Sequence, residues 1–231
     1  MNRTGCLVAI LLVLSPAAFC RATTLYPTND GFETPNLGAG GYGYVPTNPY
    51  GIMGLPQISA ATPRLGWSFT GTTGISANGS AFGTNGATNG NVNGGATSTS
   101  GQAGFVQNGY GNPNTISQNI SGFPAGPAFV TFSLEERGGN SASVNVTLGG
   151  VDLGTYLPLS TSSFNTVTTP AIILSAGSQL LVFTGVNAVG GGDNTVFIDN
   201  VSITVPEPAS LVLLAFGAVG WFAVARRNRK V

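Results

Sequence analysis

Apolar and polar side chains alternate in short runs between residues 24 and 204, and no run keeps the 3.6-residue period of a helix. The alternation is clear at residues 129–136, 143–148 and 196–205, and Gly149-Gly150 predicts a hairpin turn into a strand over residues 151–156. Further short strands are expected at residues 31–33, 67–70, 104–107, 115–120, 171–174 and 179–183, the last two joined as a hairpin through residues 175–178. This pattern predicts an all-β fold, an antiparallel β-sandwich.

Two segments interrupt the pattern. Residues 36–58 are rich in Gly, Pro and Tyr and predict a long ordered loop. Residues 83–101 contain almost only Gly, Asn, Thr, Ser and Ala, and such a stretch predicts a mobile insertion because it has few side chains to bury. The strands on either side are too few to fold alone, so we expect a single domain.

Both ends of the chain carry apolar segments of a different kind. Residues 1–22 combine an early cation, an apolar run and small residues before a cleavage position after Cys20 or Ala22, the layout of a secretory signal peptide. Residues 209–225 hold no charged side chain and would form a helix of about 25 Å, at the short end of what spans a bilayer. We therefore predict a signal peptide over residues 1–22, a β-sandwich over 23–205 and a C-terminal segment with one transmembrane helix over 206–231.

A cationic cluster follows the apolar run at once. Its members are Arg226, Arg227, Arg229 and Lys230. The positive-inside rule keeps such a cluster on the cytoplasmic side, which would place everything before Pro206 outside the membrane.

Composition excludes several classes of function. The chain has no histidine, and its two cysteines, Cys6 and Cys20, lie in the predicted signal peptide. Ser-His-Asp and Cys-His triads, histidine-ligated zinc or iron, and thiolate chemistry are therefore excluded in the exported domain. The only cations of that domain are Arg64 and Arg137, too few to neutralise the phosphates of a nucleic acid.

Paired carboxylates remain as a catalytic option, and Glu135-Glu136 is the obvious pair. Adjacent residues of a strand point to opposite faces, so these two cannot flank one glycosidic bond. The alternative is a strand end that runs into the Gly138-Gly139 turn, with Arg137 screening the charges. We therefore expect a protein that is not an enzyme and requires no cofactor.

Asp199 lies in the last predicted strand, where alternation puts it on one face with Phe197, Val201 and Ile203. A carboxylate among core residues needs partners. One answer is a structural calcium ion, which takes hard oxygen ligands. The other is a set of hydrogen bonds from loop amides or from Ser and Thr hydroxyls.

Tyrosines in glycine-rich sequence are the candidates for ligand binding, since sugars stack on aromatic rings beside amide or carboxylate groups. They are Tyr42, Tyr44, Tyr50 and Tyr110. The alternative for them is packing within the long loop, and Trp67, which Phe69 follows at alternate spacing, is expected in the core.

The C-terminal segment resembles the PEP-CTERM sorting signal of envelope-building bacteria. Pro206, Glu207 and Pro208, the apolar helix and the cationic cluster occur in the order of that family. The resemblance implies an exosortase, a membrane protease-transpeptidase, as a processing partner beside signal peptidase. It also implies transient anchoring in the inner membrane and a final place in the outer cell envelope or the extracellular matrix.

A second resemblance covers most of residues 29–205. Its motifs are Asp30-Gly31-Phe32-Glu33, Gly66-Trp67-Ser68-Phe69, residues 74–79, 102–107, 116–118 and 193–201. They are similar to the galactose-binding-like jelly rolls of carbohydrate-binding modules and DUF642 domains. The resemblance implies a jelly-roll β-sandwich and an extracellular glycan as ligand. It also implies that Glu33 and Asp199 share a calcium ion, with Asp193 as a further ligand.

Three functions therefore compete. The first is a surface-sorted, non-catalytic β-sandwich that binds or builds a polysaccharide matrix. The second is a purely structural surface or biofilm protein without a small ligand, and the third is a carbohydrate-active enzyme. Ice binding finds no support, because the sequence has no regular Thr-x-Thr ladder.

Overall fold

The computed structural model describes residues 22–45, 66–81, 101–108, 114–137, 142–187 and 194–206. All strand pairings among them are antiparallel. The larger sheet consists, in spatial order, of β10 (Asn165–Thr168), β7 (Gly126–Glu136), β13 (Asn194–Val205), β5 (Gln102–Asn108), β4 (Thr73–Ala77) and β2 (Tyr42–Val45). Two short strands add to it, namely β1 (Thr23–Leu25) beside the end of β13 and β11 (Ile172–Leu174) beside the start of β7.

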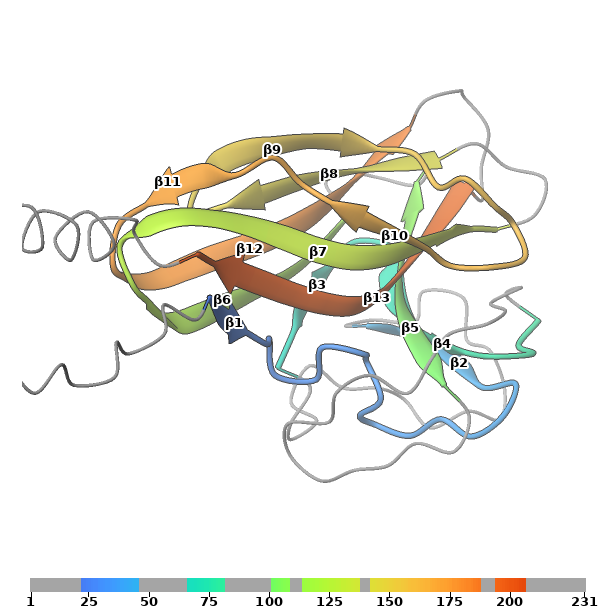
Figure 1. Ribbon diagram of the computed structural model, residues 1–231. Coiled ribbons are helices and arrows are strands. Elements are labelled where there is room, and N and C mark those ends of the chain that lie inside the picture. Colours follow the sequence, from blue (N-terminus) through green and yellow to red (C-terminus); the bar gives the residue numbers. More distant parts are fainter. Residues whose placement is uncertain are drawn as a thin grey trace, which may run out of the picture. The chain divides into compact units, whose positions relative to one another are not determined.

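The smaller sheet has five strands. In spatial order they are β3 (Ser68–Thr70), β6 (Thr115–Phe123), β12 (Gly177–Asn187), β8 (Ala142–Leu148) and β9 (Val151–Tyr156). The chain crosses between the sheets at every connection from β5 onward except β8–β9 and β10–β11, which each stay within one sheet (Figure 1). Four strands of each sheet, in the orders β10-β7-β13-β5 and β6-β12-β8-β9, form a jelly-roll β-sandwich.

The core lies between the two sheets and follows from the alternation of each strand. Inward-facing residues include Val130, Phe132 and Leu134 of β7, Val144, Val146 and Leu148 of β8, and Val196 and Ile198 of β13. All of these side chains are fully buried. Trp67 is buried as predicted, and its ring stacks on that of Phe32 with 5.1 Å between ring centroids.

The N-terminal segment between β1 and β2 contacts both sheets, through Thr28 to Gln118 of β6 and through Phe32 to Gln102 of β5. Phe32 enters the core, where its ring occupies the space that a side chain at Gly104 would fill. Gln102 fixes the segment from β5, because its Nε2 donates to the carbonyl oxygens of Phe32 (2.8 Å) and Pro35 (2.9 Å). Its Oε1 accepts a hydrogen bond from the backbone nitrogen of Leu37 at 2.6 Å.

Three local predictions are wrong. Residues 31–33 are the end of a turn over residues 28–31 and the two residues after it, and do not form a strand, because Asn29 and Phe32 adopt positive φ angles of 59° and 58°. The expected loop at 36–58 contains β2. Residues 175–178 do not join a hairpin, since β11 pairs with β7 whereas β12 pairs with β6 and β8. No helix among the described residues is long and apolar enough to cross a membrane.

Candidate ligand-binding surface

A row of side chains crosses the outer face of the larger sheet, the face turned away from the core. The register places Phe197 of β13 opposite both Glu135 of β7 and Phe105 of β5. Phe105 in turn faces Gly74 of β4, which faces Tyr44 of β2. Five strands therefore contribute to one row, which we call the outer aromatic row.

The aromatic part of the row is a second hydrophobic cluster, separate from the main core. Ala103, Phe105 and Phe197 are fully buried in it, and Tyr42, Tyr44 and Phe164 pack against them as partly buried rings. Gly74 makes this packing possible, because a Cβ there would lie 2.7 Å from the Phe105 ring. The ring of Tyr44 meets that of Phe105 edge to face, with 5.2 Å between centroids.

Polar groups border the tyrosines. The hydroxyl of Tyr44 donates a hydrogen bond to Oε1 of Gln107 at 2.9 Å. Gln107 lies on β5 opposite Thr195, and Asn114 donates from its Nδ2 to the Gln107 carbonyl oxygen at 2.6 Å. Tyrosine rings that are fixed in position beside amide groups are typical components of sugar-binding sites in proteins.

Two buried carboxylates belong to the same outer face. Glu135 lies directly beside Phe197, and Asp199 pairs with Ser133 one step along the strands. The predicted face of Asp199 is wrong, because the register of β13 against β7 shifts between Asp199 and Ser202 and Asn200 has a φ of 52°. This bulge turns Val201 and Ile203 toward the core while Phe197 and Asp199 stay outside. Sequence alternation alone does not reveal such a bulge.

Asp199 makes local hydrogen bonds. Its Oδ1 accepts from the backbone nitrogen of Asn200 at 2.7 Å and its Oδ2 accepts from Asn200 Nδ2 at 3.1 Å. Glu136, which follows Glu135 in the sequence, is half-buried. Its Oε1 accepts a hydrogen bond from the Ala142 nitrogen at 3.3 Å. β7 ends at this residue.

The other predicted calcium ligand, Glu33, is buried in the N-terminal turn and accepts a hydrogen bond from the Gln102 nitrogen at 2.9 Å. The turn lies against the β13 bulge, since the Val201 nitrogen donates to the Asp30 carbonyl oxygen at 3.1 Å. Burial raises the pKa of the Asp30 carboxyl to about 6, backbone N–H groups of Gly31 and Asp30 partly offset this, and the charge of Glu33 adds to the rise. No group of three or more His, Cys, Asp or Glu side chains within the described ranges is placed to hold a metal ion.

The described residues bring Tyr42 and Tyr44 together on β2, whereas Tyr50, Tyr110 and Asp193 lie outside them. Glu207, Pro208 and the cationic cluster also lie outside, and Pro206 is the last described residue. Phe105, Phe197 and Gln107 were missed as members of the surface. A signal for Phe197 was present, because apolar residues occupy successive positions 196–198, which indicates a strand buried on both faces.

Comparison with known protein families decides the nature of the C-terminal segment. A match to the PEP-CTERM protein-sorting motif covers residues 204–230. The chain ends in a PEP-CTERM motif. This motif begins on the last two residues of β13.

No curated protein matches the chain. Among solved structures, the Stig cyclase FisC from Fischerella sp. TAU is similar with a TM-score of 0.48 and 17% identity, over 80% of this chain and 98% of its own. TmCBM61, solved in complex with β-1,4-galactotriose, has a TM-score of 0.43 and 14% identity, over 78% and 97%. The CBM36-1 domain of a xylanase from the hindgut metagenome of Trinervitermes trinervoides has a TM-score of 0.35 and 24% identity, over 57% and 96%.

Proposed function

We propose that this protein is exported, held transiently in the inner membrane by its PEP-CTERM segment, processed by an exosortase, and delivered to the cell surface or extracellular matrix. There its β-sandwich binds a polysaccharide without changing it. The outer aromatic row is the observation that carries the binding part. Its buried phenylalanines hold Tyr42 and Tyr44 partly exposed, and Gln107 fixes the Tyr44 hydroxyl.

The chemistry of this surface favours a neutral or amide-bearing glycan. Phenol rings offer apolar faces to the C–H groups of a sugar, and amides and carboxylates offer acceptors and donors to its hydroxyls. Arg137 is the single cation in the described part of the chain, so an anionic ligand would meet little attraction there.

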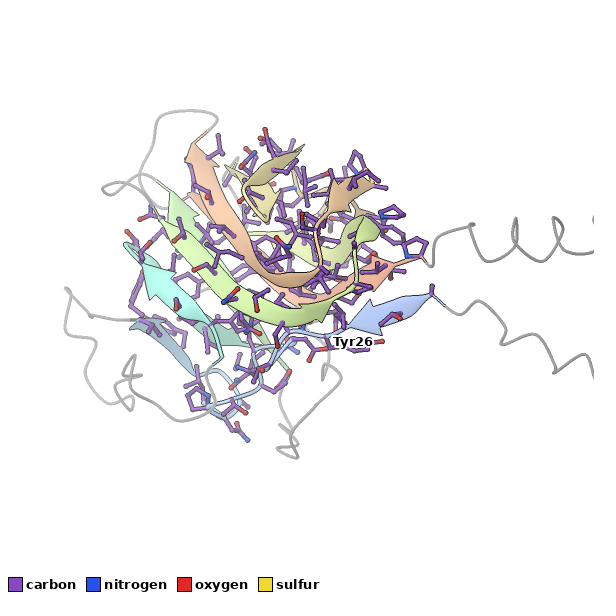
Figure 2. All side chains as sticks on the ribbon, turned by 90° about the vertical axis from the view of Figure 1, so that its left-hand side faces the viewer. Tyr26 is labelled. Atoms are coloured by element: carbon purple, nitrogen blue, oxygen red, sulfur yellow. The ribbon has the colours of Figure 1, made fainter. Side chains whose placement is uncertain are left out.

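Glycan binding is tested on an array of matrix polysaccharides with Tyr44→Ala, Tyr44→Phe and Tyr26→Ala. Tyr44→Ala should lose binding, and Tyr44→Phe should keep the stacking but lose the hydrogen bond to Gln107. Tyr26→Ala is the matched control, because Tyr26 follows β1 and lies 39% exposed outside the aromatic cluster (Figure 2). Equal binding by all three variants would contradict the proposal.

The structural alternative predicts no binding to any glycan while surface delivery continues. The enzymatic alternative predicts turnover that disappears with Glu135→Gln. Sorting itself is tested by the intact mass of the surface-extracted protein, which should show a chain ending near Pro206 and any group attached there. A mass that includes residues 209–231 would contradict exosortase processing.

A further inference from the structure

We propose that the end of the sandwich from which the PEP-CTERM segment leaves rests on the lipid bilayer before sorting. Three turns meet at this end, which we call the junction end. They connect β6 to β7, β8 to β9 and β11 to β12. The inference rests on the proposed anchoring of residues 209–225 and adds an interaction surface of the folded domain.

Strand pairings and a backbone hydrogen bond hold the three turns together. Leu174 of β11 pairs with Gly126 at the start of β7, and Gly177 pairs with Phe123 at the end of β6. The Gly149 nitrogen donates to the Leu180 carbonyl oxygen at 2.9 Å, which joins the β8–β9 turn to the start of β12. These turns lie at the left of Figure 1, the side that Figure 2 turns toward the viewer.

The chain leaves the sandwich at the same end. Thr204 of β13 pairs with Phe129, three residues after the start of β7, and Val205 pairs with Thr23 of β1. β13 has 12 residues and therefore extends about 40 Å from the junction end to the opposite end.

The tether between strand and membrane is short. From Val205 to Ala209 the chain spans at most about 14 Å when fully extended. The headgroup layer on one side of a bilayer takes roughly 5–7 Å of this length. Val205, at the junction end, is thereby held within about 7–9 Å of the lipid surface.

The side chains of the three turns at the junction end are apolar or uncharged, as a surface in contact with lipid requires. Val151, Ile173 and Leu180 are 41%, 77% and 48% exposed, high values for large aliphatic residues. Residues 121–127, 149–151 and 171–180, which form the three turns and their flanks, contain no charged residue. Contact with lipid would bury apolar surface there without removing a charge from water.

One charged residue, Asp152, directly follows the β8–β9 turn. Asp152, the nearest carboxylate, is directed back along the smaller sheet by hydrogen bonds from Asn145 Nδ2 (2.8 Å) and the Gly154 nitrogen (2.9 Å). Glu136 and Arg137 lie at the opposite end, where the Glu136 nitrogen donates to Ser160. An acidic domain so oriented keeps most of its negative charge away from an anionic membrane.

Site-specific fluorescence tests the contact. The chain without its signal peptide has no cysteine, so Ile173→Cys, Leu159→Cys and Gly217→Cys each give one labelling position. Each variant, carrying a polarity-sensitive dye, is reconstituted in phosphatidylethanolamine–phosphatidylglycerol vesicles. Leu159 is the matched control, because it is 83% exposed and lies beside Ser160 at the opposite end.

A blue shift at position 173, with quenching by a lipid-borne quencher and neither effect at 159, would support lipid contact. A lipid signal at 217 with a water signal at 173 would overturn the contact and leave the anchoring intact. A water signal at 217 would overturn the anchoring and this inference together. A shift at 173 that appears only at high protein-to-lipid ratio, or only with exosortase added, would assign the surface to a protein partner and overturn the lipid assignment.

Discussion

Phe197 of β13 stands directly opposite Glu135 of β7, on the outer face of the larger sheet, and both side chains are fully buried. An aromatic ring and a carboxylate thus share a site that the main core does not reach. The pairing joins residues that are 62 positions apart in the chain (197 − 135).

The ring of Phe197 should contribute strongly to stability. Phe197→Ala removes a buried ring between Phe105 and Glu135 and is expected to lower the free energy of unfolding by about 3–5 kcal/mol. Leu159→Ala, at an exposed position, should change it by less than about 0.5 kcal/mol. Urea denaturation measures both, and equal effects would show that the second cluster is not a packed core.

Asp30 should make stability depend on pH. The pKa of the Asp30 carboxyl is raised to about 6 in the folded protein. The stability that its protonated form contributes is therefore fully present below pH 3.8 and is lost as the pH rises through 6. The shift corresponds to up to about 3 kcal/mol at pH 7 and above. Asp30→Asn should therefore raise the melting temperature at pH 7.5 and flatten its decline between pH 4.5 and 7, measured with a chelator present.

Asp152→Asn is the control for this profile. Hydrogen bonds from the Gly154 nitrogen and from Asn145 lower the pKa of the Asp152 carboxyl, so its contribution is lost only as the pH falls. The variant should leave the profile between pH 4.5 and 7 unchanged. A wild-type profile that is already flat in this window would contradict the assignment to Asp30.

Gln102 should hold the N-terminal segment in place. Gln102→Ala removes its hydrogen bonds to Phe32, Pro35 and Leu37, and we expect a loss of about 1–3 kcal/mol. Amide hydrogen exchange should accelerate at Leu37. Gln179→Ala, which removes one exposed bond to Ser175, is the matched control and should leave exchange at Leu37 unchanged.

The calcium ion that the resemblance implies at Glu33 and Asp199 would lie between the N-terminal turn and the β13 bulge and should raise the melting temperature of the domain. The hydrogen bond from the Val201 nitrogen to the Asp30 carbonyl oxygen joins these two segments directly. Glu33→Gln and Asp199→Asn should each abolish the increase, and Asp152→Asn should not. An unchanged melting temperature of the wild-type domain over a calcium titration would remove the metal hypothesis.

Loss of the PEP-CTERM segment should leave the sandwich folded. Residues 22–208 form one compact unit, and the core strand β13 ends at Val205, before Glu207 and Pro208. A chain stopped after Pro206 should unfold at the same denaturant concentration as the chain stopped after Pro208. A chain stopped after Ser202 is the contrasting variant, because it removes Ile203 and Val205 from the core and should be strongly destabilised.

The sequence by itself determined the all-β fold class of the protein and its C-terminal sorting signal. Alternation with a period of two is a local property, so strands such as β7, β8, β9 and β13 could be located from it. The PEP-CTERM motif is a continuous segment and needs no tertiary contact to be identified.

Only the tertiary structure decided which strands became neighbours and therefore what the surface contains. Tyr44, Phe105, Glu135 and Phe197 come from four strands, and strand pairing across the sheet brings them into one row. The bulge at Asn200 put Asp199 on the face opposite to Val201 and Ile203, because the extra residue reverses the alternation that follows it. Strand order and bulges depend on packing between distant segments, and a local pattern of apolar and polar residues does not contain that information.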